Sequence, residues 1–428
     1  KPASPGMENR QTVVMQSHLD MVHQKNADTD FNFDTDGINM FVDGDWVKAK
    51  GTTLGADNGI GVASIMTLLA SSDIAHPPLE ALFTIDEETG MTGALGLKGG
   101  LLQGKILLNL DTEDDDELTI GCAGGIDVTA NGTYVAEEIT GDMSCFKLYV
   151  KGLTGGHSGM DIHIGRGNAN KIMNRLLATA ADKYGTRIHT IDGGGLRNAI
   201  PRESFSLIAV PSAQTGALLS FIETISGIIR SEYKTTDPNL SITIEKAEIV
   251  GTVLPIAFQN KLLGSIYSCA NGIYRMSPDI PGLVQTSNNL ARVLVKDGNF
   301  EIMCLTRSAV DSEKEDLATA IKSCFELAGA TVGYGGSYPG WAPYPDASIV
   351  KLMSSLYKEK YGTDANVNAC HAGLECGIIG RNYPGMEMIS FGPNITGAHS
   401  PDEKVQISSV QKYWGYLLET MKRIPSVG

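Results

Sequence analysis

The stretch Leu82-Phe83-Thr84-Ile85-Asp86-Glu87-Glu88-Thr89-Gly90 joins an apolar run to three acidic side chains and a glycine. The apolar, β-rich segment Leu79–Ile85 is typical of a buried strand. Carboxylates at the end of such a strand need a cation or hydrogen-bond donors in order to stay charged away from water. Two adjacent glutamates suit a metal site, because one can bind the ion while the other takes a proton from water. Taken alone, the stretch is equally compatible with a surface turn of solvated acids.

Other segments place histidines and carboxylates in similar positions. They supply His18 and Asp20 after the strand-like Val13–Ser17, Asp57 in the glycine-bracketed turn Gly55–Gly59, Asp111 after Ile106–Leu110, and His399 within Gly397–Glu403. In open α/β sheets the functional groups gather at the carboxyl ends of the strands. We therefore expect these side chains to converge in space, although they lie far apart in the sequence.

Composition limits the classes of function. The chain has 428 residues, 42% of them hydrophobic and 19% charged, which is typical of a soluble globular protein with room for two domains. The formal net charge of −15 argues against nucleic acid or an anionic membrane as a partner, because both require a basic face. Apolar stretches such as residues 216–230 are interrupted and too short to span a bilayer.

Cysteine usage and the first residues bear on the compartment. The seven cysteines form no C-x-x-C pair, and an odd number of buried thiols favours a reducing, cytoplasmic setting. The start, Lys1–Gly6, has neither an initiator Met nor an apolar signal core. We expect further residues to precede Lys1, so a processed leader stays open as an alternative.

The order of the expected elements predicts a mixed, mostly parallel sheet sandwiched by helices. Residues 1–123 alternate strand, helix and strand, with a loop at 21–36 and a hairpin at 41–50 turning at Asp43-Gly44. The acidic run Glu113–Glu117 is interpreted as a solvated loop. The same style returns in residues 338–428, with helices at 346–361 and 405–422 and an apolar run at 386–391.

Residues 124–337 have a different pattern, typical of an inserted α+β domain. Its first half follows a βαββαβ order, with strands at 146–150, 187–191, 204–210 and 241–245 and helices at 166–183 and 214–233. A looser second half has helices at 257–270 and 311–328 and strands at 282–296, 299–308 and 330–335. Gly193-Gly194-Gly195 is interpreted as a loop. Because candidate ligands lie on both sides of the insertion, we expect it to act as a lid.

Six motifs in order resemble those of the co-catalytic di-zinc exopeptidases that include aminoacylase and the carnosinases. They are S-H-L-D at 17–20, G-A-D-N-G at 55–59, D-E-E-T-G at 86–90, N-L-D-T-E at 109–113, G-G-H-S-G at 155–159 and G-A-H-S-P-D-E at 397–403. H-A-G-L-E-C-G at 371–377 and S-N-N-L-A at 287–291 most resemble the aminoacyl-histidine dipeptidase branch. The likeness runs from about residue 11 to the end, although the family's usual first helical segment is unaccounted for.

The resemblance implies two zinc ions, which manganese or cobalt could replace. Asp57 would bridge them, with His18 and Asp111 on one ion and Glu88 and His399 on the other. Nitrogen and carboxylate ligands of this kind suit zinc. Asp20 would lie behind the site and orient His18. The resemblance also implies a cis peptide bond between Asp57 and Asn58.

The resemblance further implies that Glu87 is the general base and that His157 donates to the oxyanion. Asn198, Arg307, Gly373 and Glu375 are candidate substrate-binding residues, Arg307 for a carboxylate and Glu375 for a free ammonium group. The implied activity is hydrolysis of unblocked dipeptides, Xaa-His dipeptides among them. A homodimer is the oligomeric state that we consider. The alternatives are an N-acyl amino acid amidohydrolase, a tripeptidase, and an inactive metal-bound binding protein. A nucleotide-binding enzyme is disfavoured, because no phosphate-binding glycine loop occurs.

Overall fold

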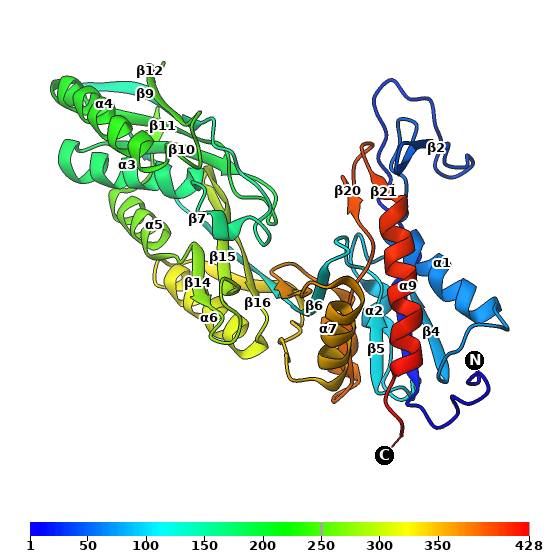
Figure 1. Ribbon diagram of the computed structural model, residues 1–428. Helices are drawn as coiled ribbons and strands as arrows, with labels where there is room; N and C mark the ends of the chain where they lie inside the picture. The colour runs from blue at the N-terminus through cyan, green and yellow to red at the C-terminus, as the bar shows by residue number, and fades with distance from the viewer. Residues whose placement is uncertain (249–250, 428) are drawn as a thin grey trace. The chain divides into compact units, whose positions relative to one another are not determined.

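The computed structural model describes residues 1–248 and 251–427 and divides into two compact units (Figure 1). Unit 1 consists of Lys1–Cys122 and Gly340–Gly428, and unit 2 consists of Ala123–Pro339. The chain thus leaves unit 1 once and returns to it once. The insertion predicted at residues 124–337 falls inside unit 2.

Unit 1 is built on a six-stranded sheet with the order β18-β6-β19-β5-β1-β4. Its strands are β1 (Val13–His18), β4 (Leu79–Thr84), β5 (Ile106–Asn109), β6 (Glu117–Cys122), β18 (Asn366–Cys370) and β19 (Glu387–Ser390). Every neighbouring pair is parallel except β19 with β6. The predicted mixed, mostly parallel sheet is therefore confirmed.

Helices cover both faces of this sheet, and strand β1, which lies between β5 and β4, is buried on each side. Val14 packs with residues of α8 (Glu375–Asn382), and Gln16 on the same face bonds Glu375. Ser17 faces the other way and donates to the carbonyl of Asn58 in α1 (Ala56–Ala70). All six residues of β1 are buried, and the hydrogen bonds to Glu375 and Asn58 allow the polar side chains of Gln16 and Ser17 to lie there.

The remaining elements of unit 1 include a small four-stranded sheet with the order β2-β3-β21-β20. The predicted hairpin is β2 (Met40–Asp43) and β3 (Trp46–Ala49), and β20 (Ile395–Thr396) pairs with β21 (Lys404–Gln406). Helix α9 (Ile407–Arg423) packs on α7 (Ser348–Tyr361), and the short α2 is Thr92–Gly96. The predicted helix start at residue 405 was wrong, because Val405 pairs with Val47 in the sheet.

Unit 2 contains a nine-stranded sheet, in which the two predicted halves share one set of strands. The order is β12-β9-β11-β10-β15-β16-β7-β17, with β14 also paired to β15. The strands are β7 (Gly124–Thr133), β9 (Met143–Lys151), β10 (Arg187–Gly194), β11 (Ser204–Pro211), β12 (Ser241–Lys246), β14 (Gly272–Met276), β15 (Val284–Lys296), β16 (Asn299–Ser308) and β17 (Thr331–Tyr338). A separate pair joins β8 (Glu137–Glu138) to β13 (Thr252–Val253).

Four long helices contribute to the core of unit 2. They are α3 (Ala169–Tyr184), α4 (Thr215–Glu232), α5 (Ile256–Ser268) and α6 (Asp311–Glu326). Unit 2 also has two short 3-10 turns, η1 (Ile162–Ile164) and η2 (Ser212–Gln214).

Two expectations for unit 2 needed correction. Gly193 and Gly194 belong to β10 and are not loop, and residues 166–168 precede α3, because Asn168 caps that helix with its side chain. Among the described residues, no helix is both long and apolar enough to cross a membrane.

Candidate metal centre and associated residues

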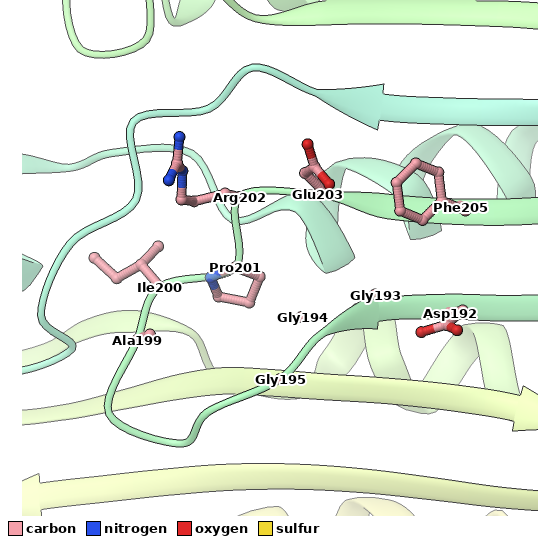
Figure 2. A pocket seen from close by; sticks show the side chains of 10 residues that line it. All are labelled: Asp192, Gly193, Gly194, Gly195, Ala199, Ile200, Pro201, Arg202, Glu203 and Phe205. Carbon is pink, nitrogen blue, oxygen red and sulfur yellow. The ribbon is translucent and has the colours of Figure 1, made fainter. Parts of the chain in front are cut away.

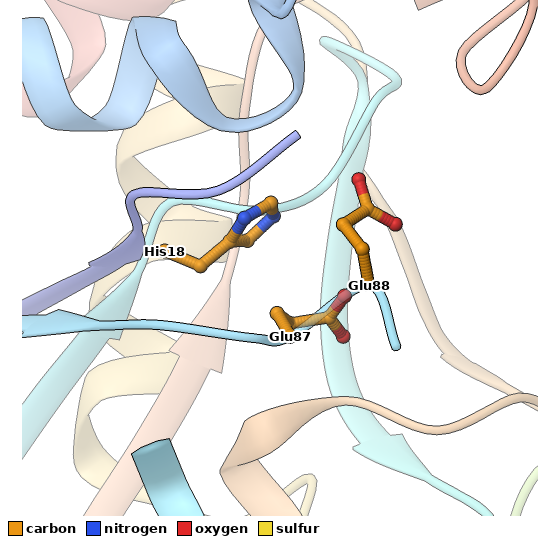
Figure 3. Close-up of side chains that lie close together, drawn as sticks. All are labelled: His18, Glu87 and Glu88. Carbon is orange, nitrogen blue, oxygen red and sulfur yellow. The ribbon is translucent and has the colours of Figure 1, made fainter. Parts of the chain in front are cut away.

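Three strands of the unit 1 sheet bring candidate residues to one edge. His18 is the last residue of β1 and lies beside Thr84 of the parallel strand β4. Glu87 and Glu88 follow β4 after a turn at Asp86, whose φ is +61° (Figure 3). Asp111 follows β5, which pairs with the other side of β1. The convergence expected from parallel strand ends is thus observed in the geometry.

Asp57 lies between the two candidate histidines. Its Oδ1 is 3.2 Å from Nε2 of His18, and its Oδ2 is 3.3 Å from Nε2 of His399. The side chain of Asp57 is 12% exposed, so both oxygens are largely withdrawn from water. The Asp57–Asn58 peptide bond is cis, as expected. One carboxylate therefore faces two imidazoles, the arrangement required of a bridging ligand.

The other carboxylates complete two groups around Asp57. Asp111 Oδ1 is 3.3 Å from His18 Nε2, and Glu88 Oε2 is 2.9 Å from His399 Nε2. Three sets have ligand atoms within 4.8 Å of one another: His18, Asp57 and Asp111; Asp57, Glu88 and His399; and His18, Glu87 and Glu88. The first two sets match the two ligand groups that the resemblance implies.

These residues fit divalent metal ions. Imidazole nitrogens and carboxylate oxygens are ligands that zinc accepts. Oε1 of Glu88 is buried and has no hydrogen-bond partner among the described residues. A buried carboxylate oxygen left in that state is costly unless a cation or a donor meets it.

Neighbouring residues orient the candidate ligands. Nδ1 of His18 lies 3.0 Å from the backbone oxygen of Asp20 and 3.6 Å from its carboxylate Oδ1. The Asp20 carboxylate also accepts the backbone N–H of Glu88 at 3.1 Å. Asn58 donates its side-chain amide to Asp111 at 2.5 Å. Sequence reasoning gave no role to Asn58, although it stands in the quoted motif G-A-D-N-G.

The electrostatics of the cluster follow from this packing. Although burial disfavours a charged ring, hydrogen bonds to Asp111 and Asp57 raise the pKa of His18 to about 12. Hydrogen bonds to Asp57 and Glu88 raise the pKa of His399 to about 10. Despite its burial, the same two imidazoles hold the pKa of Asp57 below its usual range. The site is therefore built to hold positive charge next to Asp57.

Glu87 has a different environment from its neighbour. Burial, followed by the negative charge of Asp111, raises the pKa of Glu87 to about 9. Burial also raises the pKa of Asp111. A carboxyl group with a raised affinity for protons beside a cluster of metal-ligand atoms suits proton transfer.

Glu375 lies behind this cluster and is completely buried. Its Oε2 accepts hydrogen bonds from Gln16 Nε2 and Thr84 Oγ1, both at 2.6 Å, while Oε1 has no partner among the described residues. Burial raises the pKa of Glu375 to about 7. Gly373 precedes it in the turn that leads into α8. The only part of Glu375 open to a further partner is thus Oε1.

Unit 2 brings two of its candidate residues together. The loop 155–159 pairs with 198–200 through the backbone, since Ser158 N–H donates to Asn198 at 2.7 Å and Ile200 N–H donates to Gly156 at 2.9 Å. His157 and Asn198 therefore lie on adjoining loops. Burial, followed by the positive charge of Arg307, lowers the pKa of His157 to about 4.

Arg307 is the third candidate in unit 2 and is 4% exposed on β16. One guanidinium nitrogen donates to the hydroxyl of Tyr338 at 2.9 Å. Its Nε is buried without a hydrogen-bond partner among the described residues. A buried guanidinium with unused donor capacity is suited to a carboxylate ligand.

A cavity of about 450 Å³ in unit 2 adjoins the loop that follows Asn198, since Ala199 and Ile200 are among its lining residues (Figure 2). It is lined by residues 192–195, 199–203 and Phe205. Of its three charged side chains, Asp192 pairs with Arg292 at 2.6 Å and Arg202 donates to the carbonyl of Leu153 at 3.1 Å. None of the candidate site residues lines the cavity.

Comparisons with known proteins agree with this geometry. The model of "Peptidase family M20/M25/M40" matches residues 14–423. The chain is 45% identical over 426 residues to the cytosol non-specific dipeptidase of Escherichia coli strain K12, an alignment that covers 100% of this chain and 88% of that protein.

Solved structures show the same relationship. Aminoacylhistidine dipeptidase from Vibrio alginolyticus matches with a TM-score of 0.94 and 44% identity, over 100% of this chain and 87% of that chain. Aminopeptidase PepT from Bacillus cereus ATCC 10987 has a TM-score of 0.53 at 15% identity, over 99% of this chain and 83% of that chain, and shows the fold alone. With these matches and the cluster around Asp57, the chain belongs to peptidase family M20/M25/M40 and is a metal-dependent hydrolase of that family.

Proposed function

We propose that this protein is a metallo-dipeptidase that hydrolyses the peptide bond of unblocked dipeptides, including Xaa-His dipeptides such as β-alanyl-histidine. The observation that carries the proposal is Asp57, which faces His18 and His399 while Glu87 lies in the same cluster. Relatives named as dipeptidases match the whole chain at 44% and 45% identity, which supports the substrate class.

Two zinc ions are the proposed cofactors, with manganese or cobalt as substitutes. His18, Asp57 and Asp111 would hold one ion, and Asp57, Glu88 and His399 the other. Bound ions would polarise the substrate carbonyl and lower the pKa of a water molecule. Asp20 would keep His18 in place through the backbone and carboxylate contacts described above.

Glu87 is the proposed general base and general acid. Its carboxyl would take a proton from the attacking water and then deliver it to the nitrogen of the leaving amine. The raised pKa of Glu87, about 9, supports the second step, because a carboxyl that holds a proton tightly can carry it to the amine. Glu88, in contrast, faces His399 and is assigned to metal binding.

Unit 2 would supply the remaining substrate contacts as a lid. We assign His157 to the oxyanion, Asn198 to the substrate backbone and Arg307 to the C-terminal carboxylate. The neutral His157 ring and the free donor capacity of Arg307 support these roles. Gly373 and Glu375 are assigned to the substrate's amino end. Glu375 is completely buried, and among the described residues its Oε1 has no partner and would be the atom that meets an ammonium group.

A substrate panel on zinc-loaded protein tests the proposal. Unblocked Xaa-His and other dipeptides should be cleaved, whereas an N-acetylated amino acid and a tripeptide should be poor substrates. Preference for the N-acetylated compound would make the protein an N-acyl amino acid amidohydrolase, and preference for the tripeptide would make it a tripeptidase. Zinc binding without hydrolysis of any of these compounds would indicate a binding protein.

We further propose a cytoplasmic location and a homodimer. In the described part of the chain none of the seven cysteines forms a disulfide, which suits a reducing compartment, and the Escherichia coli relative is named a cytosol enzyme. Light scattering of the purified protein measures the oligomeric state directly, and a monomer mass would rule out the dimer.

A further inference from the structure

Glu403 is a buried acid whose partners lie more than 340 residues away in the sequence. Its side chain is 3% exposed. Oε2 accepts the backbone N–H groups of Leu54 at 2.6 Å and Gly55 at 2.9 Å, and Oε1 accepts those of Ala56 at 2.8 Å and Asp57 at 3.3 Å. One carboxylate thus binds four consecutive N–H groups, the last of which belongs to the candidate bridging residue.

These four N–H groups lie at the start of α1, and Glu403 is the side-chain acceptor that they have among the described residues. Gly55, the residue that precedes the helix, forms no capping hydrogen bond. Asp57 and Asn58 have non-helical backbone angles, so the regular helix does not fix Asp57 in place. N–H groups in a first turn need an acceptor, and a carboxylate is the most favourable one there. Glu403 therefore supplies the side-chain acceptor for the N–H groups that lead up to and include that of Asp57.

Glu403 also belongs to the loop that carries His399. Strands β20 and β21 pair through Thr396 and Lys404, so residues 397–403 form the loop between them. Within the loop, Ser400 N–H donates to Gly397 at 3.2 Å and Glu403 N–H donates to Ser400 at 3.0 Å. The Glu403 carboxylate thus links the loop that carries His399 to residues 54–57, the segment that carries Asp57.

We propose that Glu403 is a positioning residue that holds Asp57 and His399 at the relative position that metal binding requires. This role rests on the metal centre of the proposed function. An amide at this position could offer only one oxygen to the four N–H groups and would direct its own N–H groups at them. Loss of the carboxylate would let Asp57 move relative to His399, and the metal affinity would fall. Changes to residues that orient metal ligands typically reduce metal affinity by about 10–100-fold.

The test compares zinc affinity in two variants of the full chain, measured by competition with a chromophoric chelator. Glu80→Gln is the matched control, because Glu80 also accepts backbone N–H groups, those of Gln103 and Gly104, but stands at the start of β4. Glu403→Gln should lower the affinity for the weaker-bound zinc at least about tenfold. Glu80→Gln should leave both affinities unchanged.

The shorter acid in Glu403→Asp keeps the charge and should restore part of the affinity lost in Glu403→Gln. Thermal unfolding of the metal-free proteins is measured alongside. Equal zinc affinity in Glu403→Gln and the parent would overturn the proposal, whatever happens to the unfolding temperature. Failure of both Glu403 variants to fold would also overturn it, because Glu403 would then serve the whole unit. If the parent itself binds no zinc, the metal centre of the proposed function is wrong instead.

Discussion

The Nδ1 atom of His157 accepts a hydrogen bond from the backbone N–H of Met160 at 3.0 Å. Gly159 N–H donates to the same nitrogen at 3.2 Å. A ring nitrogen that accepts two hydrogen bonds carries no proton, so the neutral imidazole bears its proton on Nε2. The loop that follows His157 therefore fixes the tautomer and leaves Nε2–H as the donor that the proposed oxyanion contact needs.

This environment predicts that His157 is neutral throughout the neutral pH range. Burial and the charge of Arg307 lower its pKa from 6.5 to about 4. In ¹⁵N NMR titrations of histidine-labelled protein, the signal lost in His157→Gln should titrate near pH 4 and show the Nε2–H tautomer. A midpoint of about 6 to 7, or an Nδ1–H tautomer, would contradict the assignment.

The same shift has a consequence for stability. Because the folded-state pKa lies below the ordinary value, the unfolded chain binds this proton first as the pH falls. The contribution of His157 to folding stability is therefore complete above about pH 6.5 and is lost as the pH falls towards 4. The free energy of unfolding of unit 2 is measured in urea, with hydrogen exchange of its amides as the probe. Between pH 6.5 and 4 this free energy should fall less in His157→Gln than in the parent.

The metal centre predicts the stoichiometry of metal binding. The parent should bind two zinc ions per chain, about 3.5–4 Å apart, with Asp57 between them. His399→Ala removes a nitrogen that faces both Asp57 and Glu88, and should reduce tight binding to about one ion. His189→Ala is the control, because that ring lies in unit 2, where its Nδ1 hydrogen-bonds the carbonyl of Thr252 at 2.6 Å. Elemental analysis after gel filtration gives the count, and equal zinc in His399→Ala and the parent would remove His399 from the ligand set.

Glu87→Gln should separate chemistry from metal binding. The amide keeps the size of the side chain but cannot transfer the proton, so kcat should fall at least about 10²-fold. Both zinc ions should remain, because Glu88 and not Glu87 faces His399. Turnover within a few-fold of the parent would rule out Glu87 as the base, and loss of a zinc ion would make it a ligand.

Arg307→Ala should act mainly on substrate binding. The guanidinium is nearly buried and has an unpaired Nε, so its removal leaves a carboxylate of the substrate without its partner. We expect KM to rise at least about tenfold for dipeptides, with a smaller change for the C-terminal amides of the same dipeptides. An equal rise in KM for the dipeptides and for their C-terminal amides would show that Arg307 does not recognise the carboxylate.

The sequence was most informative where buried strands end in polar residues. His18 and Asp111 end strand-like segments, so their shared edge could be predicted from the geometry of parallel strands. Strand β7 was missed although Ile126, Val128 and Ala130 alternate, because its glycines suggested a boundary. The role of Glu403 could not be predicted from the sequence. An acid that binds backbone N–H groups leaves no complementary side chain in the sequence, and its partners lie 346–349 residues away.

Asn289, like Glu403, is a buried polar residue that hydrogen-bonds the backbone near a candidate site residue. It binds the backbone on both sides of Asn198, the candidate substrate-binding residue. Its side-chain amide donates to the carbonyls of Arg197 at 2.9 Å and Ala199 at 2.8 Å, which flank Asn198. Its neighbour Asn288 is also buried, but donates to Ala270 instead. The two residues form a matched pair for testing whether the loop must be held in place.

Asn289→Leu and Asn288→Leu should each destabilise the protein by about 1–3 kcal/mol, because each removes a buried side-chain amide and its hydrogen bonds to part-buried backbone carbonyls. Only Asn289→Leu frees the loop around Asn198, and a displacement of about 1 Å at a substrate-binding residue can lower the rate about 10²-fold. We expect kcat/KM for dipeptides to fall at least about tenfold more in Asn289→Leu than in Asn288→Leu. Equal losses of activity in two variants of equal stability would show that Asn289 serves only the core of unit 2.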